Sequence, residues 1–222
     1  MISSDVSYFR KLLPLIAIVS IAVIACGNAD EPTSQSSVAA SDTELNSASI
    51  DGIFTIGEGS EATFTVNEQL AKLPLPNDAV LRTYGISGNI DLNNETASLV
   101  IDLHTLKSDE SRRDKYVRTQ LFASQPEAFI SVTEFPVLPE GFTDGEPFTA
   151  TIIATVNVNG VDADIEFELE SRLDTDRLLV LVKADFTWDD FGMPTPTSRF
   201  WVLKDKIHVE ALVSATPNHQ KN

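Results

Sequence analysis

The chain has 222 residues, which is enough for one large β domain or two small ones. Acidic residues outnumber basic ones by 33 to 16, and the net charge of −17 repels phosphates at long range. This argues against DNA, RNA or polybasic membrane docking. The single cysteine, Cys26, excludes an internal disulfide and a cysteine-based metal site, and the three histidines lie far apart. We therefore expect no metal and no cofactor.

Residues 1–25 have the organisation of an export signal. Arg10 and Lys11 precede an uncharged, mostly apolar run over residues 12–25. At ~1.5 Å per residue, a helix of this length is too short to cross a hydrocarbon core of ~30 Å, so a secretory signal is predicted. The run ends in residues 23–26 (VIAC), which resemble the lipobox of bacterial lipoproteins. That resemblance implies cleavage before Cys26, a lipid on its thiol, and an extracytoplasmic protein anchored at the cell surface or in the periplasm.

Residues 26–49 are expected to contain the lipidated cysteine and a tether. From Gly27 to Ser49 the chain is rich in Ser, Ala, Thr and acidic residues, and it lacks aromatics and apolar periodicity. Such a segment cannot bury enough apolar surface to offset the entropy cost of ordering, so it is predicted to be disordered. The folded domain is predicted over residues 50–216, followed by a C-terminal tail at 217–222.

From Ile50 onward, apolar and polar residues alternate with the period of a β-strand. In the clearest run, residues 161–170, every second residue is apolar and the others are all acidic. Residues 148–158 alternate in a similar way, and Asn159-Gly160 between the two runs is a strong signal for a type I′ hairpin. Similar alternation predicts strands near residues 52–56, 62–67, 84–92, 99–103, 180–188 and 207–213.

One segment departs from this pattern. Residues 108–122 contain no Gly or Pro, carry Asp109 and Glu110 near their start, and place apolar residues at helical spacing, which predicts one amphipathic helix. Eight or nine strands with a single helix indicate an all-β fold, either a sandwich or a closed antiparallel barrel, and closure is favoured because it removes exposed edges. A barrel of about eight strands is filled by side chains or holds one elongated ligand.

Several short motifs resemble those of the YceI-like family in order and spacing. They are residues 59–66 (GSEATFTV), 87–92 (SGNIDL), 106–109 (LKSD), Arg113-Asp114, 129–132 (FISV), Gly160-Val161, Phe186 and Phe191-Gly192. The resemblance spans residues 50–215 and implies a lipocalin-like antiparallel β-barrel with one short helix, whose interior binds a polyisoprenoid such as a quinone or a related lipid. Two positions depart from the family: Gly59 stands where a histidine is often found, and Ala163-Asp164 replaces a frequent Lys-Pro.

A site for an isoprenoid chain needs a deep apolar lining, although residues that simply fill the barrel would have the same composition. Tyr84 is the one candidate that also offers a hydroxyl group to a ligand head. The residues expected on the inner face are Phe64, Val66, Tyr84, Ile86, Ile90, Leu99, Ile101, Leu103, Ile130, Val132, Val156, Val158, Ile165, Phe167, Phe186 and Val209.

No nucleophile–base pair, metal-ligand spacing or cofactor motif points to catalysis, so a binding protein is expected and not an enzyme. Arg113-Asp114 is interpreted as a structural ion pair or a clamp onto the barrel rim. The leading hypothesis is a lipid-anchored carrier or sequestering protein for an isoprenoid-like lipid. The alternative is an envelope stress or interaction scaffold without small-molecule cargo, with an outward patch at Leu179 and Leu181, and a homodimer stays open under either hypothesis.

Overall fold

The computed structural model describes residues 52–218, and the predicted signal segment, Cys26 and the tether lie outside this range. The described chain forms ten antiparallel strands. They are β1 (Ile53–Ile56), β2 (Glu61–Leu70), β3 (Asn77–Thr83), β4 (Ile86–Asp91), β5 (Thr96–Asp102), β6 (Glu127–Val132), β7 (Phe148–Val158), β8 (Val161–Asp174), β9 (Arg177–Thr187) and β10 (Trp201–Pro217). Three short 3₁₀ segments, η1 (Leu103–Thr105), η3 (Glu140–Asp144) and η4 (Asp189–Phe191), join them.

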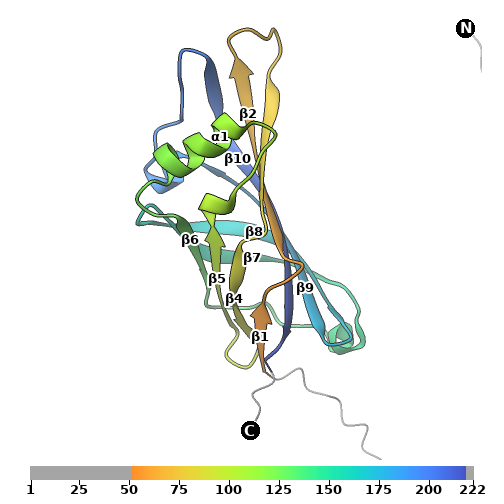
Figure 1. The fold of residues 1–222 in the computed structure, drawn as a ribbon. Helices are drawn as coiled ribbons and strands as arrows, with labels where there is room; N and C mark the ends of the chain where they lie inside the picture. The colour runs from red at the N-terminus through yellow and green to blue at the C-terminus, as the bar shows by residue number, and fades with distance from the viewer. Residues whose placement is uncertain (1–51, 219–222) are drawn as a thin grey trace, which may run out of the picture. The chain divides into compact units, whose positions relative to one another are not determined.

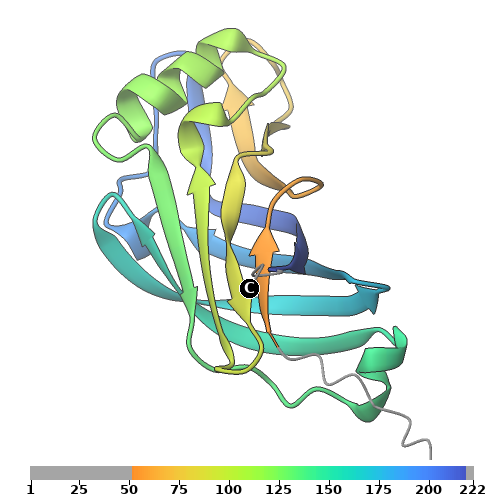
Figure 2. The same ribbon diagram turned by 60° about the horizontal axis from the view of Figure 1, so that its bottom comes forward.

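The ten strands form an eight-stranded barrel, because two of the eight strand positions are each occupied by two short strands that follow one another. β2 and then β1 lie along the same edge of β10, and β3 and β4 pair with β2 and β1 respectively. From there each strand pairs with the next in the chain until β9 meets β10, and the β1–β10 pairing closes the ring. Figures 1 and 2 show the strands curling round into one wall. The predicted antiparallel barrel of about eight strands is therefore confirmed.

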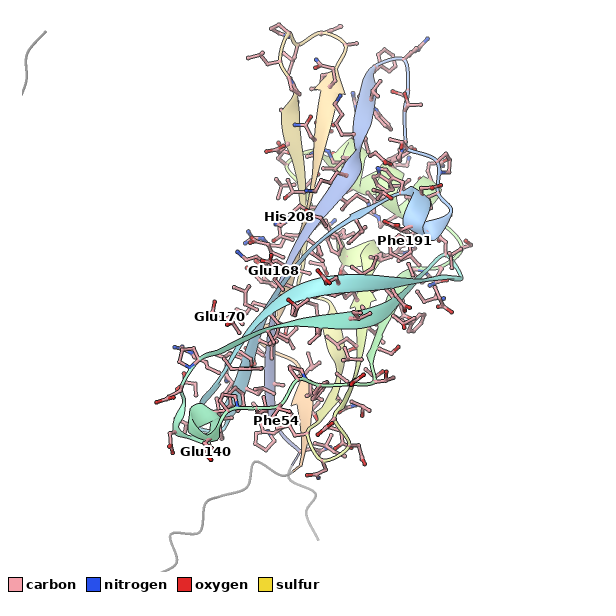
Figure 3. The ribbon with its side chains drawn as sticks, turned by 180° about the vertical axis from the view of Figure 1, so that it is seen from behind. Phe54, Glu140, Glu168, Glu170, Phe191 and His208 are labelled. Carbon is pink, nitrogen blue, oxygen red and sulfur yellow. The ribbon has the colours of Figure 1, made fainter. Side chains whose placement is uncertain are left out.

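The β7–β8 hairpin follows directly from its sequence pattern. Asn159 and Gly160 have φ values of 52° and 79°, the left-handed conformation that a type I′ turn requires at both central positions. The acidic residues of β8, from Asp162 to Glu170, are all exposed on the outside of the barrel, among them Glu168 and Glu170 in Figure 3. The apolar residues between them face inward, so the period of two separates solvent from core.

The break between β3 and β4 corrects one prediction. The buried residues are Ala79, Leu81 and Thr83 in β3 but Ile86 and Ile90 in β4, so the inward-facing parity changes at Tyr84-Gly85. A shift of one residue reverses the face of a side chain. Tyr84, expected on the inner face, is instead 68 % exposed on the outside, and residues 84–92 are not one continuous strand.

The predicted helix is present near one end of the barrel (Figure 1). It consists of α1 (Ser111–Tyr116) followed by one π-helical turn, η2 (Val117–Leu121). The carboxylate of Glu110 accepts a hydrogen bond from the Arg112 backbone N–H at 3.0 Å and caps the helix start. Within residues 52–218, no helix has the length and apolar character needed to span a bilayer.

Candidate ligand-binding site

The interior of the barrel contains two apolar cavities. The larger, of about 160 Å³, is lined only by apolar side chains, and the smaller, of about 130 Å³, has Ser171 as its one hydroxyl-bearing neighbour. Both cavities share the side chains Leu99, Ile130, Phe167, Val182 and Val213. These five residues therefore separate two neighbouring compartments of a single interior.

Most of the residues predicted to face inward line one of these cavities. The larger cavity is lined by Phe64, Val66, Ile86, Leu99, Ile101, Leu103, Ile130, Val156, Val158, Phe167, Phe186 and Val209, and the smaller one adds Ile90 and Val132. Ile165 is buried in a cluster with Val156, Phe191 and Val209, but unlike these three residues it lines neither cavity. Tyr84 is outside the barrel, so its hydroxyl is not available to the interior.

Side chains at the centre of the barrel are incompletely packed. Leu99, Ile130, Phe167 and Val182 face inward, yet each retains accessible surface. Protein interiors are normally packed to crystal-like density with few voids larger than a water molecule. The residual surface on these inward side chains therefore belongs to a preformed apolar space and not to solvent outside the barrel.

The helix closes the end of the larger cavity. Val117, Leu121 and Phe122 line this cavity from η2 and the residue after it. Two side chains hold this turn: Asn159 Nδ2 donates to the Leu121 carbonyl at 3.1 Å, and His104 Nε2 lies 2.9 Å from the Phe122 carbonyl oxygen. The helical spacing of the apolar residues was visible in the sequence, but their role as a cover over the cavity was not.

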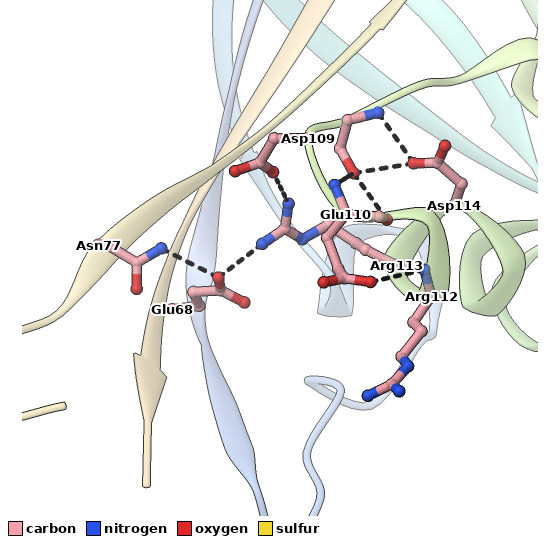
Figure 4. Close-up of polar contacts among 8 residues, drawn as sticks. Glu68, Asn77, Asp109, Glu110, Arg112, Arg113 and Asp114 are labelled. Atoms are coloured by element: carbon pink, nitrogen blue, oxygen red, sulfur yellow. Dashed lines mark hydrogen bonds and ion pairs between the residues drawn. The ribbon is translucent and has the colours of Figure 1, made fainter. Parts of the chain in front are cut away.

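An ion-pair cluster fixes α1 to the barrel wall (Figure 4). Arg113 donates to Glu68 on β2 at 2.7 Å and to Asp109 at 2.6 Å, and Asn77 Nδ2 donates to the same Glu68 carboxylate at 3.0 Å. Burial lowers the pKa of Arg113, but the hydrogen bonds and charges of Asp109 and Glu68 outweigh this effect and raise it, so the guanidinium stays charged. Glu68 is only 5 % exposed, which makes this contact part of the rim structure.

Asp114 has a separate structural role. It is 5 % exposed, and its carboxylate accepts hydrogen bonds from both the backbone N–H and the hydroxyl of Ser108, each at 2.8 Å. Arg113 and Asp114 thus bind different partners and do not form a pair with each other. The clamp onto the rim expected from the sequence therefore applies to Arg113, which binds Glu68 on β2, whereas Asp114 holds the segment just before the helix through Ser108.

Part of the wall of the larger cavity also borders a hollow on the outer surface beside the helix. Leu121, Phe191 and Met193 line the cavity from inside and also line a hollow on the outer surface, together with Tyr116, Asn159 and the segment 194–197. Asn159 Nδ2 contacts Met193 Sδ at 3.5 Å, while its Oδ1 is buried without a hydrogen-bond partner. We name Leu121, Phe191 and Met193 the gate, because these side chains line both the cavity and the hollow.

The opposite end is closed by the segment 133–147. Phe135, Leu138 and Phe142 of this segment line the smaller cavity, and Phe142 packs edge-on against Phe148 with ring centroids 6.4 Å apart. Within residues 52–218, no group of three or more His, Cys, Asp or Glu side chains is placed to hold a metal ion. The arrangement provides apolar volume bordered by the helix at one end and by the segment 133–147 at the other.

The fold has parallels among solved structures. A polyisoprenoid-binding domain from Saccharophagus degradans, implicated in plant cell wall breakdown, superposes with a TM-score of 0.61 at 18 % identity, over 75 % of this chain and 99 % of that one. BcnA of Burkholderia cenocepacia superposes with a TM-score of 0.50 at 12 % identity, over 71 % of this chain and 96 % of that one. At such identities the likeness establishes the fold.

Sequence comparison extends the likeness to the family level. Among proteins with curated descriptions, no sequence matches this chain. The YceI-like domain family matches residues 32–215, which include every strand up to the last residues of β10. With a barrel of the expected topology and a match over most of its length, the chain belongs to the YceI-like domain family.

Proposed function

We propose that this protein holds an apolar, isoprenoid-like lipid inside the barrel and acts as a carrier or sequestering protein. The observation that carries the proposal is the larger cavity, whose lining contains no charged or amide side chain. Such a lining binds a long apolar chain and offers little to a polar metabolite. The family match and the apolar cavity wall both support a binding role.

The cavity volumes bound the part of a ligand that fits without rearrangement. An apolar cavity of ~150 Å³ accommodates a molecule the size of benzene. The two compartments, of about 160 and 130 Å³, are each close to this size. Together they accommodate roughly two or three prenyl units before any side chain moves. A longer chain requires rotation of the separating side chains, above all Phe167, which lines both compartments.

The gate provides the route of entry in this proposal. Leu121, Phe191 and Met193 line both the cavity and the outer hollow; Leu121 ends the π-helical turn η2, Phe191 ends η4, and Met193 follows it by two residues. A ligand head would remain in the outer hollow, whose lining includes Tyr116. The tail would pass the gate into the larger cavity.

We also propose that the protein acts outside the cytoplasm on a lipid anchor at Cys26. The support is the sequence of residues 1–26, with its export signal and the VIAC motif. Mass spectrometry of the membrane-extracted protein should find a diacylglycerol on Cys26, and the Cys26→Ser variant should leave the membrane fraction. An unmodified cysteine in membrane-extracted protein would contradict the anchor.

The cargo is tested on the domain of residues 50–222. All ten strands and their pairings lie within residues 53–217, so this part contains its own core. The purified domain is extracted with organic solvent, before and after incubation with quinones and prenyl phosphates, and bound lipids are identified by mass spectrometry. We expect a stoichiometric prenyl lipid.

A matched pair of variants locates the ligand. Leu99→Trp adds bulk where the two compartments meet and should strongly weaken lipid binding, because the indole ring obstructs the space between them. Ile153→Trp adds a comparable group at a side chain that is 64 % exposed on the outer surface and should leave binding intact. Circular dichroism checks that both variants fold. An empty extract from the wild-type domain would favour the alternative, an envelope scaffold without cargo.

A further inference from the structure

The barrel carries a projection at its helix end. The β2–β3 hairpin and the start of β10 extend beyond α1 (Figures 1 and 3). Arg199 and Phe200 occupy the turn of a tight hairpin closed by the Ser198 N–H donating to the Trp201 carbonyl at 2.8 Å. A hydrogen bond from the Ala71 N–H to the Phe200 carbonyl, also 2.8 Å, joins this turn to the β2–β3 loop. We name residues 71–76 and 198–202 the finger tip.

The finger tip exposes large apolar side chains. Leu75 is 73 % exposed, Phe200 57 %, Leu73 49 % and Val202 48 %. Scattered apolar residues on a surface need no explanation, but four on two adjoining turns form a group. Pro74 and Pro76 stiffen the β2–β3 loop, so the apolar side chains are presented on a restrained backbone.

This end of the molecule is basic, although the whole chain is strongly acidic. The outer part of the β2–β3 hairpin, residues 67–78, the helix segment 107–122 and the segment 193–206 together carry nine basic and six acidic residues, a net charge of +3. Tyr116 stacks edge-on against Trp201 with ring centroids 5.3 Å apart, and Arg113 pairs with Glu68, so helix and projection share one surface. The net charge of −17 is therefore unevenly distributed.

The opposite end provides the contrast. Val137 is 93 % exposed there, more than any other large apolar residue of the described chain. Its segment, residues 133–147, contains four acidic and no basic residues. Exposed apolar side chains therefore occur at both ends, but the finger tip carries the basic residues Lys72 and Arg199 beside them, whereas the segment 133–147 carries acidic residues.

We propose that the finger tip docks on the surface of an anionic lipid bilayer. Leu73, Leu75 and Phe200 would enter the boundary between headgroups and acyl chains, while Lys72 and Arg199 would contact lipid phosphates. Arg199 lies 4.5 Å above the ring of Phe200, which suits a side chain that keeps its charge at the interface while its neighbour is immersed.

Docking in this orientation has a consequence for the proposed cargo. The segment from Met193 in the gate leads directly along the chain to Arg199 and Phe200 in the finger tip. A docked molecule would thus hold its gate at the bilayer end, where an apolar ligand could pass without crossing much water. The docking itself does not depend on cargo, and the two are tested separately.

The test uses the lipid-free domain of residues 50–222, which lacks both the signal and Cys26, and vesicle flotation. Vesicles contain phosphatidylcholine with or without one third phosphatidylglycerol. We expect binding to the anionic vesicles that weakens as salt is added. Leu75→Ser with Phe200→Ser should lower the affinity at least about tenfold. Lys72→Glu with Arg199→Glu should lower the affinity at least about fivefold for each basic residue replaced, and only on anionic vesicles.

Two controls make the same kinds of change, one at an exposed apolar residue and one at an arginine, at the other end of the barrel. Val137→Ser and Arg172→Glu should bind vesicles like the wild type, because neither lies near the finger tip. The proposal is overturned if the wild-type domain does not float with anionic vesicles, or if Leu75→Ser with Phe200→Ser floats equally well. It is also overturned if the tip instead pairs with a second copy, seen as a dimer in solution that Phe200→Ser dissociates.

The two proposals fail in different ways. Lipid extraction from the finger-tip variants should still yield the prenyl lipid, because none of the changed residues lines a cavity. Vesicle binding by a domain that never acquires cargo would leave docking in place and remove only the carrier. A cargo-loaded domain that does not bind vesicles would remove only the docking.

Discussion

Phe167→Ala tests whether the two compartments form one ligand site. Phe167 lies on β8 and lines both cavities, so loss of its ring should join them. The ring occupies roughly 100 Å³, and added to compartments of about 160 and 130 Å³ this gives one continuous space long enough for a longer prenyl chain. The variant should therefore carry longer chains than the wild type.

The same change should destabilise the domain without ligand. A cavity increment of roughly 100 Å³ at ~24 cal/mol per Å³ contributes about 2.4 kcal/mol, and lost burial of the ring adds to it. Because Phe167 already borders empty space, we expect the lower end of the range for Phe→Ala, about 3 kcal/mol. With a urea m-value of ~2 kcal/mol/M, the unfolding midpoint should fall by about 1.5 M.

Ligand binding should recover much of this loss. A prenyl lipid present at ~100 times its dissociation constant stabilises the folded state by about 2.7 kcal/mol. The assay is urea unfolding followed by tryptophan fluorescence, with and without lipid, and mass spectrometry of the bound chains. Phe129→Ala is the matched control: Phe129 is 45 % exposed on the outer face of β6, so its removal should cost less than about 1 kcal/mol and leave chain length unchanged.

One result would refute the reasoning. If Phe167→Ala is destabilised as expected but binds the same chain lengths as the wild type, and added lipid restores no stability, the two compartments do not form a ligand path. The inward residues would then be core alone, and the space between them would be a packing defect.

Two further predictions concern the rim and the acid stability. Arg113→Met leaves the Glu68 carboxylate buried without its cation and should lower the free energy of unfolding, measured in urea, by about 3 kcal/mol. Arg112→Met, on the exposed side of α1, should lower it little. Equal losses in the two variants would contradict the clamp. The hydrogen bond from Lys206, and after it the one from His208, lowers the pKa of Asp185 in the folded protein. These contacts therefore stabilise the fold above the unfolded pKa of ~3.9, and that stabilisation is lost as the pH falls through the lower folded pKa. Asp185→Asn should therefore reduce the acid-induced loss of stability below about pH 4, by less than ~1 kcal/mol because the group is exposed, and an unchanged acid profile would exclude this contribution.

The sequence by itself determined the class of fold and most of the inward-facing residues. A strand repeats every two residues, so the alternation over residues 161–170 separates a solvent face from an inner face without reference to the rest of the molecule. The Asn159-Gly160 turn has the same local character, because its left-handed backbone depends on those two residues. The number of such strands left a sandwich or a barrel open, and the resemblance to the YceI-like family pointed to the barrel.

Three features were decided by the tertiary structure alone, because the local sequence pattern does not encode them. The change of parity at Tyr84-Gly85 depends on close approach to a distant segment, since a Cβ on Gly85 would lie 2.7 Å from Thr105 Oγ1. The cavities depend on how side chains from many strands meet, because core and pocket lining have the same composition. The basic end arises because the fold brings together segments that are far apart in the chain. The net charge of −17 for the whole chain does not reveal it.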